Sequence, residues 1–236
     1  MTGKKRTEKI LPLLKVAMFL LVTIGIAMVM RRLVILTGLM PANNKPGFGS
    51  LDQGFNKHSF TTILHIVPGA VFMILGPLQF MSSIRLGHIQ FHRWSGRVFI
   101  LAAYIIGITS TVLSFTKQST GGLTEAVASV FFSIFFLVCV SLSLYYILRK
   151  QVLLHREWMI RAFSLGLAIS TVRLIAVFTF IVFKVPLQSF LGIAFWMGFT
   201  LHTIVAEIWI NYTRKPDVTT RKAPIFPDVK KETVHQ

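Results

Sequence analysis

Two short polar motifs place histidines at the edges of long apolar runs. His92 lies in "GHIQFHRWSGR", just before the run that starts at Trp94, and His155 lies in "LLHREWMIRAF", just before the run that starts at Trp158. A neutral imidazole is a preferred ligand of haem iron and of zinc. Because both runs are expected to start from the same membrane face, the two histidines should lie at one depth. The pattern therefore predicts at most one haem b, with His92 and His155 as its iron ligands.

The same motifs also fit a purely structural role. Arginine and tryptophan beside the histidines are typical of anchors at a membrane interface, and the histidines would then complete a polar network at headgroup depth. His88 shares a helical face with His92, but this pair alone does not define a metal site. A second haem would need a further pair near the other face. Only His65 is available there, because His202 lies deeper in its run.

Arg173 and Glu207 lie inside apolar runs, where an ionised side chain is costly and is a functional candidate by default. Arg173 lies in the outer half of its run, whereas Glu207 lies closer to the inner face. We expect Arg161, which is nearer in depth, to pair with Glu207. Arg173 would then be left to hold an anionic group, such as a haem propionate or a quinone oxygen.

Six apolar runs must position these side chains. The chain has 236 residues, of which 53% are hydrophobic and only eight are acidic, and this is too apolar for a soluble domain. A hydrocarbon core about 30 Å thick needs about 20 apolar residues per helix. We expect an all-α integral membrane bundle with helices at 10–30, 60–84, 94–115, 123–148, 158–183 and 187–212. The short connections at 116–122 and 184–186 predict antiparallel hairpins.

The net charge of +17 follows the connections between these runs. The amino-terminal segment, the connections around 85–97 and 149–161, and the carboxyl-terminal tail hold 18 lysines and arginines, whereas the other connections hold six. The positive-inside rule predicts a cell-membrane protein with both termini in the cytoplasm. We divide the chain into a basic arm (1–9), a transmembrane domain (10–212) and a basic, disordered tail (213–236). The tail suits anionic lipids at the cytoplasmic face, and its basic residues are too sparse for a nucleic-acid site.

The amino-terminal order of a basic arm and then an apolar run is similar to that of a secretory signal. The run is long for a signal, and no clear small-x-small cleavage pattern follows it, so we expect the first helix to be retained. Cys139 is the single cysteine and lies within a run. One cysteine excludes an intramolecular disulfide and a thiolate metal cluster within one chain.

The stretches "LHIVPGAVFMILGPLQF", "HRWSGRVFI", "LLHREWMIRAF" followed by "VRLI", and "AEIWI" together resemble a bacterial family of predicted multi-pass membrane proteins that carry a domain of unknown function. The resemblance covers about residues 60–212 and implies a multi-helix membrane protein with no established activity. Its pattern matches at His65, Pro68, Gly69, Gly76, His92, Arg93, Gly96, Arg97, His155, Trp158, Met159, Arg161, Arg173, Trp196 and Glu207. A looser likeness to transmembrane b-type cytochromes rests on the histidines.

Three functions stay open from the sequence. The first is membrane electron transfer through one b-type haem held by His92 and His155. The second is a small transporter that uses Arg173 and Glu207, for which we expect a homo-oligomer because the chain is short. The third is a non-catalytic assembly or lipid-interacting component. The sequence contains no catalytic triad, phosphate-cradling glycine loop or zinc-protease helix motif, so it indicates no enzyme class.

Overall fold

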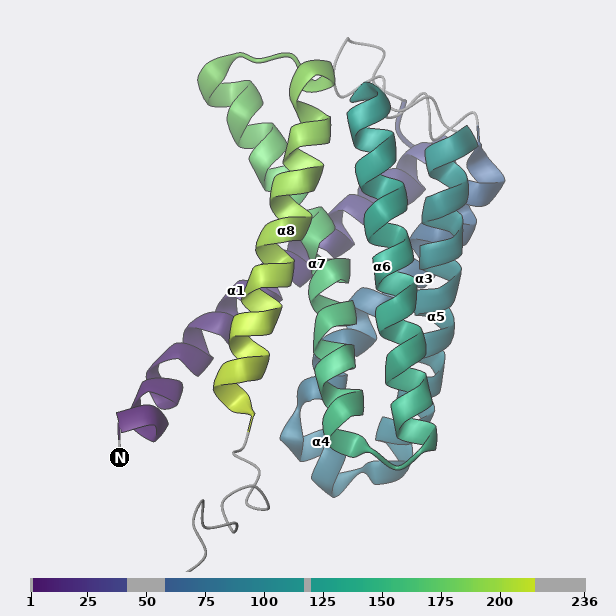
Figure 1. Ribbon diagram of the computed structural model, residues 1–236. Coiled ribbons are helices and arrows are strands. Elements are labelled where there is room, and N and C mark those ends of the chain that lie inside the picture. The colour runs from purple at the N-terminus through teal and green to yellow at the C-terminus, as the bar shows by residue number, and fades with distance from the viewer. Residues whose placement is uncertain (1, 42–57, 117–119, 215–236) are drawn as a thin grey trace, which may run out of the picture.

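Helices are the only regular elements in the described part of the chain, which is residues 2–41, 58–116 and 120–214 of a computed structural model (Figure 1). Every backbone N–H and C=O group in lipid must find its partner within the protein, and a helix achieves this within one segment. The helices are α1 (Thr2–Leu36), α3 (Ser59–Phe80), α4 (Ser82–Gly87), α5 (Ile89–Thr116), α6 (Gly122–Leu148), α7 (Val152–Phe183) and α8 (Leu187–Thr213).

The predicted all-α bundle with six membrane-spanning helices is confirmed for the described residues. Six of the seven helices are long and apolar enough to cross a membrane, and the six-residue α4 is the exception. Several helices are longer than the predicted apolar runs, because the backbone stays helical where the side chains become polar at headgroup depth. Thus α7 starts at Val152 rather than Trp158, and α1 already starts at Thr2. The predicted tail lies outside the described residues from residue 215 onward, as do residues 42–57 of the first connection.

The start of α1 and the end of α8 lie at the same end of the bundle, together with α4 and the connection from α6 to α7 (Figure 1). We call this end the near end. The opposite end, which holds the end of α1, the start of α3 and the connection from α7 to α8, is the far end. Helix α1 crosses the bundle obliquely and packs against α3 and α7. The other spanning helices pack in chain order: α3 against α5, α5 against α6, α6 against α7, and α7 against α8.

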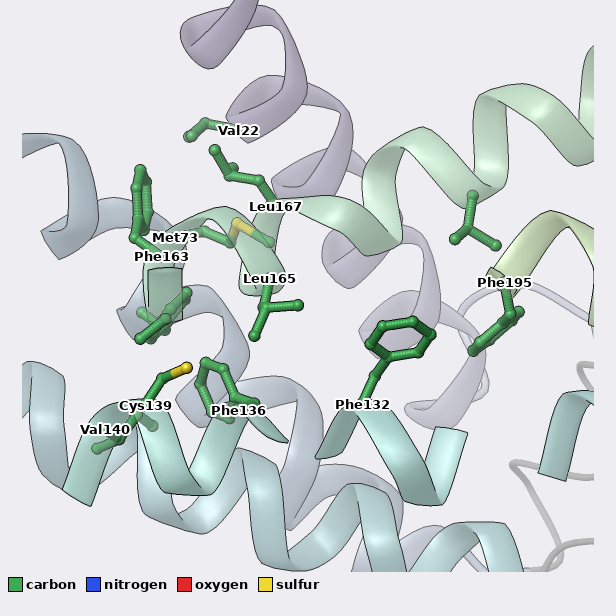
Figure 2. Packing of buried hydrophobic residues seen from close by; sticks show 14 of the residues in the cluster. Val22, Met73, Phe132, Phe136, Cys139, Val140, Phe163, Leu165, Leu167 and Phe195 are labelled. Carbon is green, nitrogen blue, oxygen red and sulfur yellow. The ribbon is translucent and has the colours of Figure 1, made fainter. Parts of the chain in front are cut away.

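Aromatic side chains fill the centre of the bundle. The rings of Phe72 and Phe99 stack with their centroids 4.4 Å apart, and Phe163 lies 5.8 Å from Phe72. Figure 2 shows other buried side chains of the same core, where Phe136 and Cys139 of α6 face Leu165 of α7. Without a hydrophobic driving force between helices in lipid, this close packing of side chains is what holds them together.

Candidate functional site

A cavity of about 380 Å³ lies in the far half of the bundle. Its lining comes from α1, α3, α5, α6, α7 and α8, so that all six spanning helices contribute. Much of the wall is aromatic, and its rings belong to Phe72, Phe132, Phe136, Phe195 and Phe199. A mostly apolar cavity of this size is typical of a site for a small molecule.

Three arginines and one glutamate are the charged residues of the described cavity lining. Arg31 and Arg32 reach it from the end of α1, Arg173 from α7, and Glu125 from the first turn of α6. The side chain of Glu125 is buried, and the Gly121 backbone N–H donates to its Oε2 at 2.6 Å. Among the described lining residues, guanidinium groups outnumber carboxylates three to one.

Hydroxyl groups add further polar positions to the cavity wall. Ser170 is 1% exposed, and its Oγ has no hydrogen-bond partner among the described residues. A buried polar group without a partner costs about 1–3 kcal/mol, so a ligand or water atom at this point would relieve the cost. His65 also lines the cavity, with its Nδ1 3.0 Å from Thr109 Oγ1.

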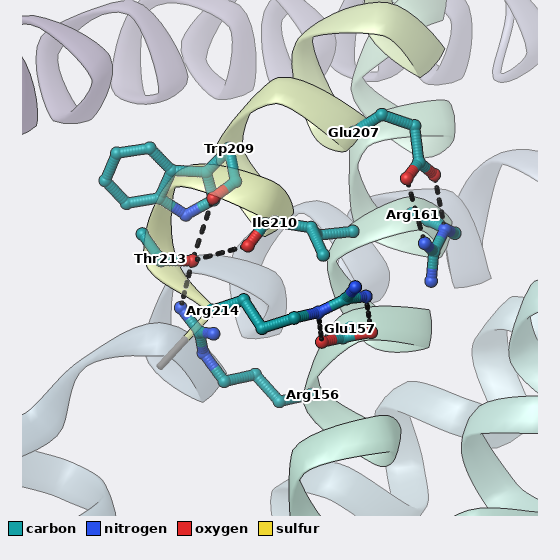
Figure 3. A network of polar contacts seen from close by, with 8 residues as sticks. All are labelled: Arg156, Glu157, Arg161, Glu207, Trp209, Ile210, Thr213 and Arg214. Atoms are coloured by element: carbon teal, nitrogen blue, oxygen red, sulfur yellow. Dashed lines mark hydrogen bonds and ion pairs between the residues drawn. The ribbon is translucent and has the colours of Figure 1, made fainter. Parts of the chain in front are cut away.

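The ion pair predicted between Arg161 and Glu207 is confirmed. Arg161 donates from Nε to Glu207 Oε1 at 2.5 Å and from Nη2 to Oε2 at 2.9 Å, which is a two-point contact between α7 and α8 (Figure 3). The guanidinium carbon also lies 4.5 Å from the centroid of the Trp158 ring. Neither residue of the ion pair lines the cavity.

A second ion pair joins the same two helices at the near end. Arg214 donates to both carboxylate oxygens of Glu157 at 2.8 and 2.7 Å, and the neighbouring Arg156 donates to Thr213 Oγ1 at 3.1 Å (Figure 3). The hydrogen bonds that Arg214 donates to Glu157 raise the pKa of Arg214 above its ordinary value. Sequence reasoning missed this pair because it counted Arg214 as part of the tail.

His92 and His155 both lie at the near end, in the first turns of α5 and α7. His155 Nδ1 lies 2.8 Å from Ser143 Oγ and 2.9 Å from the Ser143 carbonyl oxygen. His92 Nδ1 is buried and has no hydrogen-bond partner among the described residues. The two imidazoles are close enough for their charges to interact, but neither lines the cavity.

Arg173 does not join these histidines. It follows His155 by 18 residues on α7, which corresponds to about 27 Å along a helix, so one cofactor would not contact both. Within the described ranges, no group of three or more His, Cys, Asp or Glu side chains is arranged to hold a metal ion. A haem with two axial histidines needs only two ligands, and the pair of His92 and His155 stays a prediction.

His202 has a packing role that the sequence did not reveal. Its Nε2 lies 2.8 Å from Thr171 Oγ1, and its carbonyl oxygen accepts a hydrogen bond from Ser164 Oγ at 2.9 Å. Because both partners belong to α7, the buried imidazole connects α8 to α7 in mid-membrane.

The sequence reasoning also missed most of the cavity lining. Arg31, Arg32 and Glu125, which line the cavity, were not among the predicted site residues. The sequence did contain a signal for a shared site of these arginines. The Arg31–Arg32 pair follows the first apolar run at its outer end, and Arg173 lies in the outer half of another run.

Six apolar spanning helices that enclose charged side chains define a multi-pass helical membrane protein. The chain belongs to the family described as "Predicted membrane protein (DUF2306)", which matches residues 62–210. This range agrees with the predicted resemblance and includes every predicted site residue, whereas α1 with Arg31 and Arg32 lies outside it. No curated protein and no solved structure matches the chain.

Proposed function

We propose that the protein binds a small amphipathic anion in the far-half cavity and carries it within the membrane. The observation that supports this most is the presence of Arg31, Arg32 and Arg173 in the lining of one mostly apolar cavity. Guanidinium groups bind carboxylates and phosphates through paired, charge-assisted hydrogen bonds. The phenylalanine rings offer an apolar surface to the rest of the ligand, and Ser170 offers one hydroxyl group.

The sequence predicted a transporter site with Arg173 and Glu207. This proposal retains Arg173 as a ligand-binding residue and assigns Glu207 a different role. Both carboxylate oxygens of Glu207 accept hydrogen bonds from Arg161, and Glu207 is not part of the cavity wall. Glu207 would therefore hold α7 against α8 while the ligand binds elsewhere. Because a carrier with six spans is small, a homo-oligomer is part of the proposal.

Trp196 offers a reporter for binding. Its ring centroid lies 5.4 Å from that of Phe132, which lines the cavity. Replacing the other three of the four tryptophans with phenylalanine would leave Trp196 as the only indole. A brominated fatty acid should then quench its fluorescence saturably, and the brominated alcohol of equal chain length should bind more weakly. A charge-assisted hydrogen bond contributes about 1.5–3 kcal/mol, which corresponds to about 10- to 100-fold in affinity.

Three variants and one control separate the contribution of the Arg173 charge to binding from that of the space in the cavity. Arg173→Gln should remove most of the preference for the acid, whereas Arg173→Lys should retain much of it. Gly69→Leu should weaken both probes, because a Cβ at Gly69 meets no atom within 4 Å and the added side chain enters the cavity. Arg149→Gln lies outside the cavity and should change neither. Equal, unsaturable quenching by both probes in every variant would indicate simple partition into the micelle and would rule the site out.

A second candidate function is membrane electron transfer through one b-type haem between His92 and His155. The contact of Ser143 with His155 Nδ1 favours it, because an iron-ligating histidine usually has a partner at its other ring nitrogen. The buried Nδ1 of His92 has no hydrogen-bond partner among the described residues, so this ring nitrogen is open to iron. Arg173 would take no part in this site.

Visible spectra of the oxidised and dithionite-reduced protein, purified from a haem-replete host, test the second candidate. The expected result is a Soret band that sharpens on reduction and is lost in His92→Ala and in His155→Ala. His88→Ala serves as the control, because this exposed histidine lies one turn away. A featureless spectrum of the wild type would reject the haem, and failure of both assays would leave the non-catalytic lipid-interacting or assembly role.

We also propose that the protein lies in the cell membrane with its near end in the cytoplasm. The excess of basic residues at the connections of this end supports that orientation. Fusions of a cytoplasm-active and a periplasm-active reporter to the carboxyl terminus test it. Activity of the periplasm-active reporter alone would reverse the assignment.

A further inference from the structure

The near end carries more arginines than its described carboxylates can pair with. The carboxylates of Glu157 and Glu207 accept two-point hydrogen bonds from Arg214 and Arg161, while Arg156 lies within electrostatic range of Glu157 without a direct ion pair to it. Positive charge therefore remains on neighbouring helices at this end. It is carried by Arg85 on α4, by Arg93 on α5 and by Arg156 on α7.

Arg85 connects these arginines, because it lies close both to the imidazole of His92 and to Arg156. Arg85 and Arg93 both lie within electrostatic range of His92, and Arg85 also lies within range of Arg156. The short helix α4 packs against α5 and thereby brings Arg85 to this position. We call Arg85, His92, Arg93 and Arg156 the near-end basic cluster. Like charges repel one another, and a bound anion would offset this repulsion by attracting each of the cations.

Two members of the cluster offer polar groups to a ligand. Arg156 is half-buried and uses one amino group to donate to Thr213 Oγ1 at 3.1 Å, which fixes the guanidinium while its remaining N–H groups stay available. His92 has a buried Nδ1 that lacks a partner among the described residues. The fork of donors on arginine matches the geometry of a phosphate group.

Large apolar side chains surround the cluster. Leu86 and Ile89 flank it on α4 and α5, with 81% and 45% of their surfaces exposed, and Val152 and Leu153 on α7 are 60% and 72% exposed. A free phosphate ion would make no use of this surface, whereas the acyl chains of a phospholipid would cover it. Basic pockets between helices at the headgroup level of a membrane are typical sites for anionic lipid headgroups.

We infer that the near-end basic cluster binds the phosphate of an anionic phospholipid. The arginines hold the phosphate oxygens, and the exposed leucine, isoleucine and valine side chains contact the acyl chains. This site is separate from the far-half cavity and does not depend on the amphipathic anion proposed for it. It shares His92 with the haem candidate, so the two assignments exclude each other.

Native mass spectrometry of the full, delipidated chain tests the inference with phosphatidylglycerol and phosphatidylcholine as probes. The wild type should retain one phosphatidylglycerol per chain in preference to phosphatidylcholine. The double variant Arg85→Gln/Arg156→Gln should bind phosphatidylglycerol about 25-fold more weakly, since each arginine near the surface contributes about fivefold. Blocked labelling of the buried Cys139 thiol would confirm that each variant is folded.

A control with the same change in charge is available. Arg97 and Arg149 also lie at the near end, but each guanidinium is placed over an aromatic ring, at 4.7 Å from Trp94 and at 4.5 Å from Tyr145. Arg97→Gln/Arg149→Gln should leave the affinity for phosphatidylglycerol within about twofold of that of the wild type. Equal losses in both double variants would overturn the inference, because net charge alone would then explain the binding.

Three other results would also overturn the inference. Equal retention of phosphatidylglycerol and phosphatidylcholine would remove the selection for an anion. Complete displacement of the lipid by inorganic phosphate would assign the cluster to the free ion. A haem spectrum that is lost in His92→Ala would assign the same arginines to the haem propionates.

Discussion

Gly76→Ala is expected to destabilise the bundle strongly, because α3 meets α7 at this residue. A Cβ added at Gly76 would overlap the Phe163 ring, with Cδ2 and Cζ at 2.7 Å and Cε2 closer still. Ordinary van der Waals contact begins at 3.4 Å, so the ring would have to retreat by at least about 0.7 Å. Phe72, Phe80 and Phe99 pack around the ring and block that movement.

Inserting a methyl group into such a packed core costs about 1–3 kcal/mol. For a chain of this length, 1 kcal/mol corresponds to about 2–4 °C in the melting temperature, so a loss of about 2 kcal/mol predicts a shift of about 4–8 °C. Cys139 provides the assay, because the only cysteine of the chain is 0% exposed and a thiol-reactive dye reaches it when the bundle opens. Labelling would be followed while the protein is heated in mild detergent.

Gly69→Ala is the matched control, with the same substitution two turns earlier on α3. A Cβ at Gly69 meets no atom within 4 Å, and alanine favours a helix over glycine by up to about 1 kcal/mol, so this variant should melt at or above the wild-type temperature. Adding Phe163→Leu to Gly76→Ala should recover part of the loss by making room. Equal melting of the two alanine variants would refute the claim that close packing at Gly76 sets the approach of α3 to α7.

Three further predictions concern contacts between helices. A double-mutant cycle on Arg161 and Glu207, whose side chains are 14% and 41% exposed, should give a coupling of about 2 kcal/mol. The same cycle on Glu157 and Arg214 should give a smaller coupling, because the arginine is 54% exposed and solvent screens the pair; the reverse order of the two couplings would contradict this reasoning. Ser143→Ala removes a side-chain hydrogen bond between α6 and α7 and should cost about 0.6–1 kcal/mol in the thiol-labelling melt, and an unchanged melt would show that the hydroxyl contributes no stability.

The helical architecture could be predicted from the sequence because lipid imposes one strong requirement on it. Long apolar runs had to form helices, and the short connections had to join antiparallel neighbours. Helix boundaries were less predictable, since hydropathy follows the lipid core and not the backbone. The segment from Val152 to Glu157 is helical although its end is polar, and the break at Met81 separates α4 from α3 without a glycine or proline at that residue.

The candidate sites were only partly predictable because the position of a residue in an apolar run gives its depth in the membrane but not its place around the bundle. Depth was enough to pair Arg161 with Glu207, which sit on helices joined by a tight connection. It gave no information on the oblique path of α1, which brings Arg31 and Arg32 to the same cavity as Arg173. Likewise, nothing in the sequence indicated that a separate α4 would bring Arg85 near Arg156.

The two groups of arginines differ in what surrounds them, and this difference separates their roles. Arg32 is 9% exposed, and with Arg173 it lines a mostly apolar cavity of about 380 Å³ between the helices, where most of a small ligand would be taken out of the lipid. Arg85 and Arg93 are exposed beside apolar surface at the end of the bundle, where only the head of a lipid would bind while its chains stay in the bilayer. A cavity between the helices suits a ligand that is bound and released, whereas a surface site at headgroup level suits a lipid that stays with the protein. Filling the cavity by Gly69→Leu should therefore leave retention of phosphatidylglycerol unchanged, and the double arginine variant of the near end should leave quenching of Trp196 unchanged.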